Sequence, residues 1–560
     1  MSGNKKEIYD VLVVGSGASG GWVAKKLSEA GIKVAMLDAG RPQSEANFTE
    51  HEPRFKLKYR AMAPEVIRKT RPAQMDCYAC TEYNYDWFCN DLDEPYTTDP
   101  GMPFSWQGRM RVIGGRTNVW ARLSLRMGDL DLKAASVDGY GKDWPLSYKD
   151  LAPYYDEVEE YVGICGQAEG VSVLPDGKFQ PPMPLVCSEV LVRDRLKKKG
   201  YILTPCRCAN LTRPLNGRPA CHYCGPCERG CVTHSYFNSY FTTVADAIHS
   251  GNCKLIPNAM VYKVLMDTDR NRATGLLYID RITREPKEIY GRVVALCAQS
   301  LESVRILFNS ANRQYPNGLA NTSGALGRYL MDHIYGGGAV GYFPELGGKP
   351  SLGGPVNPAG SYIIRFRNVP GRPRSKNFIR GYDFQTGAGV GFNWKAPGFG
   401  EAYKKALHEP VQAFSLHGFG ECLARWDNYV EINPNVVDTF GIPVLNFHMK
   451  YGENEFALVK DMAESAGELL ELSGARNIST FAKPSIPGWS IHEVGVARMG
   501  NNPKASVLNQ FEQSHDIKNL FVMDGSAFTS SGCQNSTLTI MALCVRSCDY
   551  LMQEMKRGNI

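Results

Sequence analysis

The sequence has no long apolar run and no block of like charge. Its longest apolar stretch, around Thr537 to Val545, is far shorter than the roughly 20 residues that a helix needs to cross a bilayer, so we expect no membrane span. The net charge is +6, from 63 basic and 57 acidic residues, and lysine and arginine form no cluster that would follow a phosphate backbone. This pattern argues against a nucleic-acid-binding protein.

Internal repeats and low-complexity linkers are also missing. The first residues, MSGNKKEIYDVLVVG, lack the small-residue cleavage site of a secretory signal, so we expect no export signal in this chain. The composition, 43% hydrophobic and 21% charged over 560 residues, is that of a globular protein with a sizeable core. The 17 cysteines mostly lie outside the spacings of a small disulfide scaffold, which favours cofactor ligation for the densest group.

A glycine-rich turn near the start of the chain predicts a dinucleotide site. An apolar run ends at Gly15, helical spacing follows, and a second apolar run ends at Asp38, which together form a β-turn-α-β unit. Gly15, Gly17 and Gly20 suit the tight turn, the approach of a pyrophosphate and close helix packing, and Asp38 can accept hydrogen bonds from ribose hydroxyls. NAD and FAD proteins share this pattern, so it does not choose between them.

The rest of the chain predicts two kinds of sheet. Short apolar segments between residues 254 and 297 indicate a return to the nucleotide-binding sheet. Residues from about 338 to 449 alternate apolar and polar side chains between Gly and Pro, which is typical of an antiparallel sheet. Helical spacing returns from Glu453 to Leu472. The predicted fold class is therefore α/β, or α+β with two domains.

Three segments resemble the glucose-methanol-choline (GMC) oxidoreductase family: residues 108–127, 327–334 and 492–548. The resemblance implies FAD as the cofactor. It places a flavin-side loop at Gly114, Gly115, Thr117 and Asn118, where the glycines admit the isoalloxazine and Asn118 donates to a flavin carbonyl. It also places Asp524 and Thr537 near the ribityl and pyrimidine parts of FAD.

The same resemblance implies the catalytic pair. His492 stands where the family has its catalytic histidine, and imidazole suits the removal of a hydroxyl proton because its ordinary pKa is near neutrality. Asn535 matches the second position, where a neutral amide can hold the substrate oxygen against the base.

The resemblance further implies a Rossmann-like FAD-binding domain and a discontinuous substrate-binding domain with an antiparallel sheet. We assign residues 1–46, 101–135, 205–335 and 485–560 to the first, residues 136–204 and 336–484 to the second, and leave 47–100 as an unassigned insert.

Four cysteines, Cys221, Cys224, Cys227 and Cys231, form a C-x2-C-x2-C-x3-C run. Four thiolates so close together can wrap an iron-sulfur cluster, either [3Fe-4S] or [4Fe-4S], and structural zinc is the main alternative. Within the GMC resemblance, this insert implies the catalytic subunit of a multi-subunit sugar or sugar-acid dehydrogenase.

We therefore expect an FAD-dependent dehydrogenase that oxidises a sugar, sugar acid or glucoside, with a preference for the glucoside 3-dehydrogenase type. Gluconate 2-dehydrogenase, an O2-using oxidase with structural zinc, and a flavin-stabilised binding subunit without turnover are the alternatives. The resemblance also implies a small partner subunit that carries an export signal, a cytochrome c electron acceptor and a periplasmic location, with a cytoplasmic location as the alternative.

Overall fold

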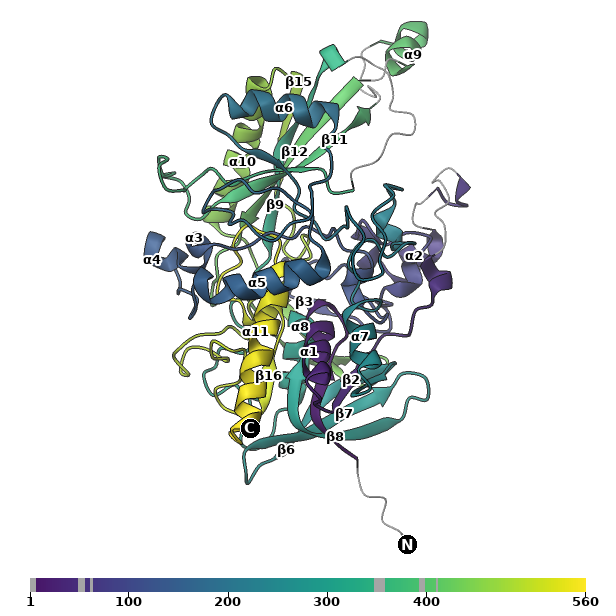
Figure 1. Cartoon of the computed structure of the whole chain (residues 1–560), viewed down its shortest axis with the longest axis vertical. Coiled ribbons are helices and arrows are strands. Elements are labelled where there is room, and N and C mark those ends of the chain that lie inside the picture. The colour runs from purple at the N-terminus through teal and green to yellow at the C-terminus, as the bar shows by residue number, and fades with distance from the viewer. Residues whose placement is uncertain (1–6, 49–55, 61–63, 347–357, 392–397, 409–410) are drawn as a thin grey trace.

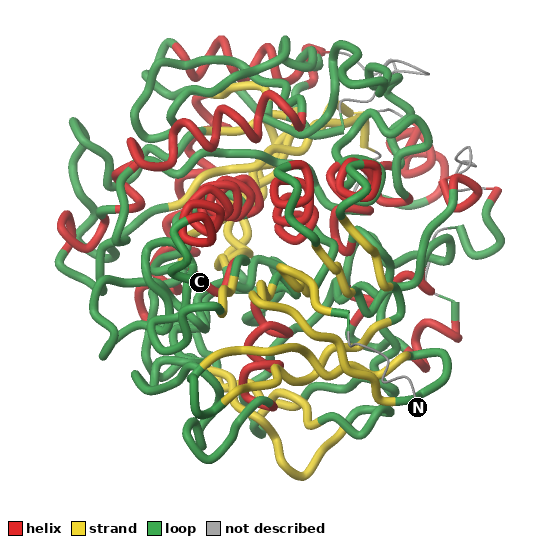
Figure 2. The backbone as a smooth tube through the Cα atoms, turned by 60° about the horizontal axis from the view of Figure 1, so that its bottom comes forward, coloured by secondary structure: helices red, strands yellow, loops and turns green. Residues whose placement is uncertain are grey.

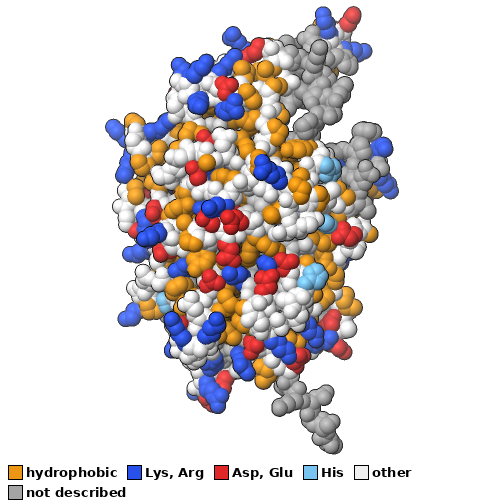
Figure 3. All heavy atoms as spheres, viewed as in Figure 1, with side chains coloured by type: hydrophobic (Ala, Val, Ile, Leu, Met, Phe, Trp, Pro, Cys, Tyr) orange, Lys and Arg blue, Asp and Glu red, His pale blue; other side chains and the backbone are white. Residues whose placement is uncertain are grey.

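The computed structural model describes residues 7–48, 56–60, 64–346, 358–391, 398–408 and 411–560. The gaps fall in the insert and in the segment 336–484, so the expectations for those stretches lie partly outside the described residues. None of the described helices is long and apolar enough to cross a membrane. On the face shown in Figure 3, acidic and basic side chains are interspersed.

A seven-stranded sheet begins at the start of the described chain and returns to it from the middle and the end. β1 (Ile8–Val14) runs parallel to both β2 (Val34–Leu37) and β8 (Pro286–Leu296), and β16 (Leu520–Val522) also pairs with β8. The main path is β5-β2-β1-β8-β7-β6. Its remaining strands are β5 (Cys253–Ile256), β6 (Ala259–Asp267) and β7 (Arg272–Asp280). The predicted β-turn-α-β unit and the predicted return to this sheet are confirmed.

Helices cover the seven-stranded sheet because its central strands are apolar on both faces. They include α1 (Ala18–Glu29), α7 (Thr243–His249), α8 (Ser300–Asn309) and the C-terminal α11 (Thr537–Lys556). α5 (Tyr148–Val162) packs against α1 and α11: the rings of Trp22 and Tyr161 lie 4.8 Å apart, and the hydroxyl oxygens of Tyr155 and Thr539 lie 2.7 Å apart. The tyrosines of α5 thus serve core packing.

A six-stranded sheet lies at the other end of the molecule (Figure 1). Its order is β15-β9-β12-β11-β10-β4, and every pair in it is antiparallel, as the alternation predicts. The strands are β4 (Leu203–Pro205), β9 (His333–Tyr342), β10 (Ser361–Ile363), β11 (Tyr382–Gly391), β12 (Val411–Glu421) and β15 (Arg476–Ala482). The predicted helix is present as α10 (Glu453–Leu472) and packs on this sheet together with α6 (Cys187–Lys197).

A small third sheet joins the insert to the rest of the protein. β3 (Thr97–Thr98), from the insert, runs parallel to β14 (Pro443–His448), which pairs with β13 (Tyr429–Val437). The shorter described helices are α2 (Glu65–Thr70), α3 (Asp129–Leu132), α4 (Ala134–Asp138) and α9 (Gly400–His408).

The two large sheets and the helices between them position the site. α11 begins near the middle of the molecule and runs toward the end that holds the seven-stranded sheet, where the chain terminates (Figure 1). Figure 2 shows the same arrangement from another side, with long loops joining the strands and helices. Loops at the junction of two rigid layers are a common place for a ligand site.

Candidate active site

A cavity of about 630 Å³ is lined by strands of the six-stranded sheet, by residues that follow strands of the seven-stranded sheet, and by the insert. Residues from the start of α1 and the start of α11 line it, as do side chains of β9, β11 and β12. Of the predicted site residues, those on the cavity wall are Gly17, Thr117, His492, Asp524, Asn535 and Thr537. The structure thus brings together residues that are more than 500 positions apart in the chain.

The glycine turn has the geometry that a pyrophosphate needs. Gly15 adopts a φ of +102°, and a Cβ on Gly20 would lie 1.9 Å from the carbonyl oxygen of Gly15, so neither position accepts a side chain. At Gly17 a Cβ would meet nothing within 4 Å, and Gly17 caps the N-terminus of α1 without a side-chain hydrogen bond. Open space beside uncapped N–H groups fits a bound diphosphate.

Asp38 lies at the end of β2 and holds the turn together. Its Oδ2 accepts hydrogen bonds from the backbone N–H of Ser16 at 2.8 Å and from Ser16 Oγ at 2.6 Å, and its Oδ1 accepts from the N–H of Gly40 at 2.6 Å. Asp38 is absent from the cavity wall. Its contact with a ribose stays a prediction.

The flavin-side loop forms a 3-10 turn from Gly115 to Asn118 that starts at Gly114, where φ is +86°. Asn118 is fully buried, and its Nδ2 donates to the carbonyl oxygens of Ile113 at 3.0 Å and Gly115 at 2.8 Å. Its amide therefore stabilises the loop. The contact of Asn118 with a flavin carbonyl stays a prediction. Thr117 faces the cavity, and its hydroxyl donates to the Gly114 carbonyl at 2.6 Å.

Asp524 and the start of α11 also face the cavity. Asp524 Oδ1 accepts from the N–H and the hydroxyl of Ser526, and Oδ2 accepts from Ser303 Oγ at 2.5 Å. Burial raises the pKa of the Asp524 carboxyl above its ordinary value. Thr537 is the first residue of α11, and Ser536 before it makes no capping hydrogen bond through its side chain, so the positive end of the helix dipole is directed at the cavity.

His492 is the centre of a chain of hydrogen bonds that sets its tautomer. His333 Nε2 lies 2.9 Å from the carbonyl oxygen of Gly532, which can only accept, so this nitrogen carries the proton. In a neutral ring the other nitrogen, His333 Nδ1, then accepts from His492 Nδ1 at 2.8 Å. His492 Nε2 is left unprotonated, and Asn535 Nδ2 donates to it at 3.2 Å. The lone pair of His492 Nε2 is therefore available at the cavity.

The environment keeps both rings neutral. Burial, followed by the neighbouring His333 and Arg116, holds the pKa of His492 well below its ordinary value. Burial lowers the pKa of His333 to about 4. The backbone of His492 is fixed as well, because its N–H donates to Asp332 Oδ1 at 3.0 Å. An unprotonated imidazole beside an amide is an arrangement that can remove a proton from a hydroxyl group.

Sequence reasoning missed His333 and Asp332. Both lie in the GRYLMDHI segment, residues 327–334, which contributes to the family resemblance but predicts no site residue. The adjacent Asp332 and His333 were the sequence signal that could have identified them as site residues. However, 159 residues separate His333 from His492, and only the fold brings the two histidines together.

The six-stranded sheet and Trp489 supply an aromatic and polar part of the cavity wall. Tyr335 stacks on Trp489 with ring centroids 4.5 Å apart, and its hydroxyl lies 2.9 Å from His417 Nδ1. Gln385 is the cross-strand neighbour of His417, and its Nε2 donates to Asn535 Oδ1 at 3.2 Å. Burial lowers the pKa of His417, so this wall is polar and uncharged.

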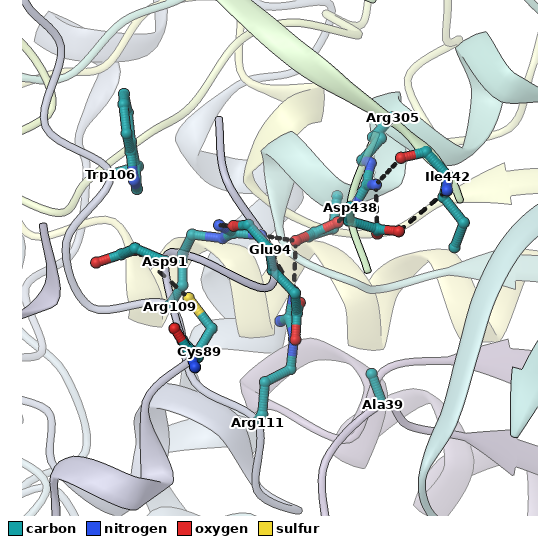
Figure 4. A network of polar contacts seen from close by, with 12 residues as sticks. Ala39, Cys89, Asp91, Glu94, Trp106, Arg109, Arg111, Arg305, Asp438 and Ile442 are labelled. Carbon is teal, nitrogen blue, oxygen red and sulfur yellow. Dashed lines mark hydrogen bonds and ion pairs between the residues drawn. The ribbon is translucent and has the colours of Figure 1, made fainter. Parts of the chain in front are cut away.

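The insert completes another part of the cavity wall, which the sequence left without an assignment. Asp76 to Ala79 and Phe88 line the cavity. A buried network anchors the insert: Glu94 Oε2 accepts from Arg111 Nε at 2.7 Å, and the Glu94 carbonyl accepts from Arg109 at 2.7 Å (Figure 4). Both arginines also pair with Glu302 of α8.

The four cysteines of the predicted cluster lie on a segment behind the cavity wall. Cys224 is exposed, Cys227 is buried, and Cys221 and Cys231 are half-buried. The hydroxyl of Tyr236 donates to the carbonyl oxygens of both Asn118 and Cys227, which ties this segment to the flavin-side loop. Within the part of the chain that the structure describes, no three His, Cys, Asp or Glu side chains are gathered to hold a metal ion. The thiols therefore share one short segment without forming a ligand set.

Comparisons with known proteins identify the family and the fold of the chain. Residues 9–335 and 424–544 match the N- and C-terminal domains described as GMC oxidoreductase. The chain is 32% identical to 2-methyl-1,2-propanediol dehydrogenase of Mycolicibacterium austroafricanum, over 97% of this chain and 95% of that protein. It is 28% identical to the fructose dehydrogenase large subunit of Gluconobacter japonicus, over 98% of each chain. The crystal structure of pyridoxine 4-oxidase from Mesorbium loti has the same fold, with a TM-score of 0.58, 17% identity, and coverage of 97% of this chain and 99% of that chain.

Proposed function

The chain belongs to the GMC oxidoreductase family, and from this premise we propose that it is an FAD-dependent dehydrogenase of a carbohydrate hydroxyl group. Membership makes it an oxidoreductase that acts on alcohol or sugar donors, and FAD is the cofactor that the family supports. The observation that carries the proposal is the hydrogen-bond chain from Gly532 through His333 to His492, which leaves an unprotonated Nε2 at the cavity.

FAD, when bound, supplies the acceptor for the hydride of the substrate C–H bond. The chain's own residues do the rest. His492 Nε2 takes the hydroxyl proton, and its Nδ1–H keeps donating to His333, so the ring keeps one orientation while the proton is transferred. Asn535 Nδ2 can turn from His492 to the substrate oxygen and hold it within reach of the base.

The wall of Tyr335, Trp489, His417 and Gln385 supports a ring-shaped polyol as the substrate. Aromatic faces cover the C–H face of a sugar ring, and neutral amide and imidazole groups bind its hydroxyls. Within this class we favour oxidation at carbon 3 of a glucoside, with gluconate 2-dehydrogenase as the alternative. A dye-reduction screen over methyl glucosides, glucose, fructose and gluconate, with the product position read by NMR, tests the proposal.

A second candidate is the oxidation of a short diol, which the 32% identity to 2-methyl-1,2-propanediol dehydrogenase favours. Adding 2-methyl-1,2-propanediol to the screen separates the two, because a diol enzyme would reduce the dye with this diol and with none of the sugars. An O2-using oxidase is distinguished by comparing rates in air with rates with a dye acceptor. If the protein oxidised none of the tested alcohols and sugars, both candidates would be overturned.

We also propose that Cys221, Cys224, Cys227 and Cys231 hold an iron-sulfur cluster that receives electrons from the flavin. The spacing of the cysteines and the position of their segment directly behind the cavity wall support this. The thiols are not gathered, so the segment would have to close around the cluster. Analysis of iron, zinc and acid-labile sulfide in the purified protein tests the proposal, since zinc without iron would point to a structural site.

The relative from Gluconobacter japonicus is named as a large subunit, so that protein is one part of an assembly. We propose a similar assembly for this chain, with a small subunit that carries an export signal, a cytochrome c acceptor and a periplasmic location. Fractionation of cells that produce the chain with and without the small subunit tests this. Cytoplasmic protein in both cases would overturn it.

A further inference from the structure

Two cysteines outside the cluster segment lie against each other in the interior. Cys165 follows α5, Cys208 follows β4, and their Sγ atoms are 3.3 Å apart. Both side chains are fully buried. They are surrounded by Met183, Ala359 and Tyr223, with Cys221 at the edge of the group.

The backbone holds the two residues in register. The N–H of Cys165 donates to the carbonyl of Cys208 at 2.9 Å, and the N–H of Cys208 donates to the carbonyl of Cys165 at 3.0 Å. This reciprocal pair is the hydrogen-bonded type of antiparallel pair, in which Cα atoms are about 5.5 Å apart. Disulfides form at Cα separations of about 4.4–6.8 Å, so a small rotation of the side chains would bring the sulfurs to bonding distance.

We propose that Cys165 and Cys208 form a disulfide bond that braces the cavity wall to the cysteine segment. The two thiols lose two protons and two electrons, and a disulfide of a thiol-disulfide oxidoreductase, or glutathione disulfide, takes them up to become two thiols. One S–S bond forms between Cys165 and Cys208, and one S–S bond of the oxidant breaks. The proposal does not depend on the substrate of the enzyme.

A disulfide at Cys208 would affect two neighbouring parts of the structure, the cavity wall and the cysteine segment. The chain around it lies between two other segments. Ser124 donates its N–H to the carbonyl of Arg207, and Ala209 donates to the carbonyl of Arg122, in the segment 122–124; on the other side, Phe237 donates to the carbonyl of Ala209. Arg122 and Leu123 line the cavity, and the segment 209–237 contains the four clustered cysteines. A covalent link at Cys208 therefore restricts the movement of both the cavity wall and the cysteine segment.

Peptide mapping tests the bond directly. Native holoenzyme is treated with excess glutathione disulfide, then denatured in alkylating reagent and digested with trypsin and chymotrypsin together. Cleavage after Arg207 and Leu211 separates Cys208 from both Cys206 and Cys221. We expect a linked pair of peptides that contain Cys165 and Cys208. Alkylated or glutathione-modified Cys165 and Cys208 without the linked pair would overturn the proposal.

A variant pair tests the brace. Cys165→Ser should abolish the linked peptides and lower the Tm of the oxidised protein by a few degrees. Cys206→Ser, two residues before Cys208, is the control. Cys165→Ser should also speed amide exchange in residues 209–237. Cys206→Ser should keep the linked peptides, and its amide exchange should stay as slow as in the unsubstituted protein. If reduction changes neither the Tm nor the exchange of the unsubstituted protein, the bond does not brace the segment and the proposal fails.

Discussion

The reacting end around His492 and the cysteine segment around Cys227 organise their polar groups in opposite ways. At the reacting end, each ring nitrogen of His492 and His333 has a fixed partner without any ligand present. In the cysteine segment the thiols are spread from exposed to buried and form no ligand set among the described residues.

The physical chemistry of the groups explains this difference. Neutral imidazole and amide groups attract one another through hydrogen bonds, so protein packing alone can fix their geometry. Thiols bind each other weakly, and as thiolates they repel, so hydrogen bonds between the thiols themselves do not gather four of them into one site. Burial accordingly raises the pKa of Cys227 to about 11. The hydrogen-bond partners around His492 are therefore supplied by the protein itself, whereas the four thiols of the cysteine segment are not gathered by contacts with one another.

The largest effect should come from removing the base. His492→Ala should lower kcat by about 10²- to 10⁴-fold, because proton removal loses its acceptor, while the flavin spectrum is retained. His515→Ala is the matched control, since His515 bonds with Ser506 and the Gly500 carbonyl and is absent from the cavity wall. Equal activity of the two variants would place the base elsewhere.

On the cysteine side, Cys227→Ser should remove bound iron and stop the reduction of one-electron acceptors. Because the reacting end is independent, substrate should still bleach the flavin under anaerobic conditions. Cys187→Ser, at an exposed cysteine outside the segment, should change neither property. Unchanged iron content in Cys227→Ser would rule out this cysteine as a ligand.

A smaller effect is expected from the positioning residue His333. His333→Ala should lower kcat by about tenfold, since one buried hydrogen bond contributes about 1–1.5 kcal/mol. In the unsubstituted enzyme the low pKa of His492 keeps the base unprotonated, so kcat/KM should stay level from pH 8 down to pH 6.5 and fall only in more acidic buffer. Loss of His333 removes one cause of the low pKa, so the acid limb should move to higher pH. If His333→Gln restored kcat, a positioning role for His333 would be supported. If the acid limb of the pH profile did not move in His333→Ala, this role would be contradicted.

The smallest effect should come from the aromatic wall. Trp489→Leu should raise KM for a sugar by roughly two- to tenfold, from the loss of about 0.5–1.5 kcal/mol of stacking, with little change in kcat. Trp426→Leu is the control, because Trp426 is 49% exposed and does not line the cavity. A fall in kcat without a change in KM would show that Trp489 acts on the chemical step and not on binding.

Local patterns in the sequence were sufficient for much of the fold. The glycine turn from Gly15 to Gly20, the alternation between residues 338 and 449 and the helix from Glu453 to Leu472 each depend on neighbouring residues, so their secondary structure was predictable. The packing of α5 on α1 and α11 was not predictable, because an apolar stripe shows that a helix is buried without showing what buries it.

The sequence by itself determined which chemical groups are available: a histidine and an asparagine in the C-terminal block, a phosphate-binding turn and a run of cysteines. Only the tertiary structure decided how they act. The tautomer of His492 depends on His333 and Gly532, the amide of Asn118 is directed into its own loop, and Cys165 meets Cys208 across 43 residues. Hydrogen bonds between distant segments fix proton positions and side-chain directions, and these contacts arise only when the chain has folded.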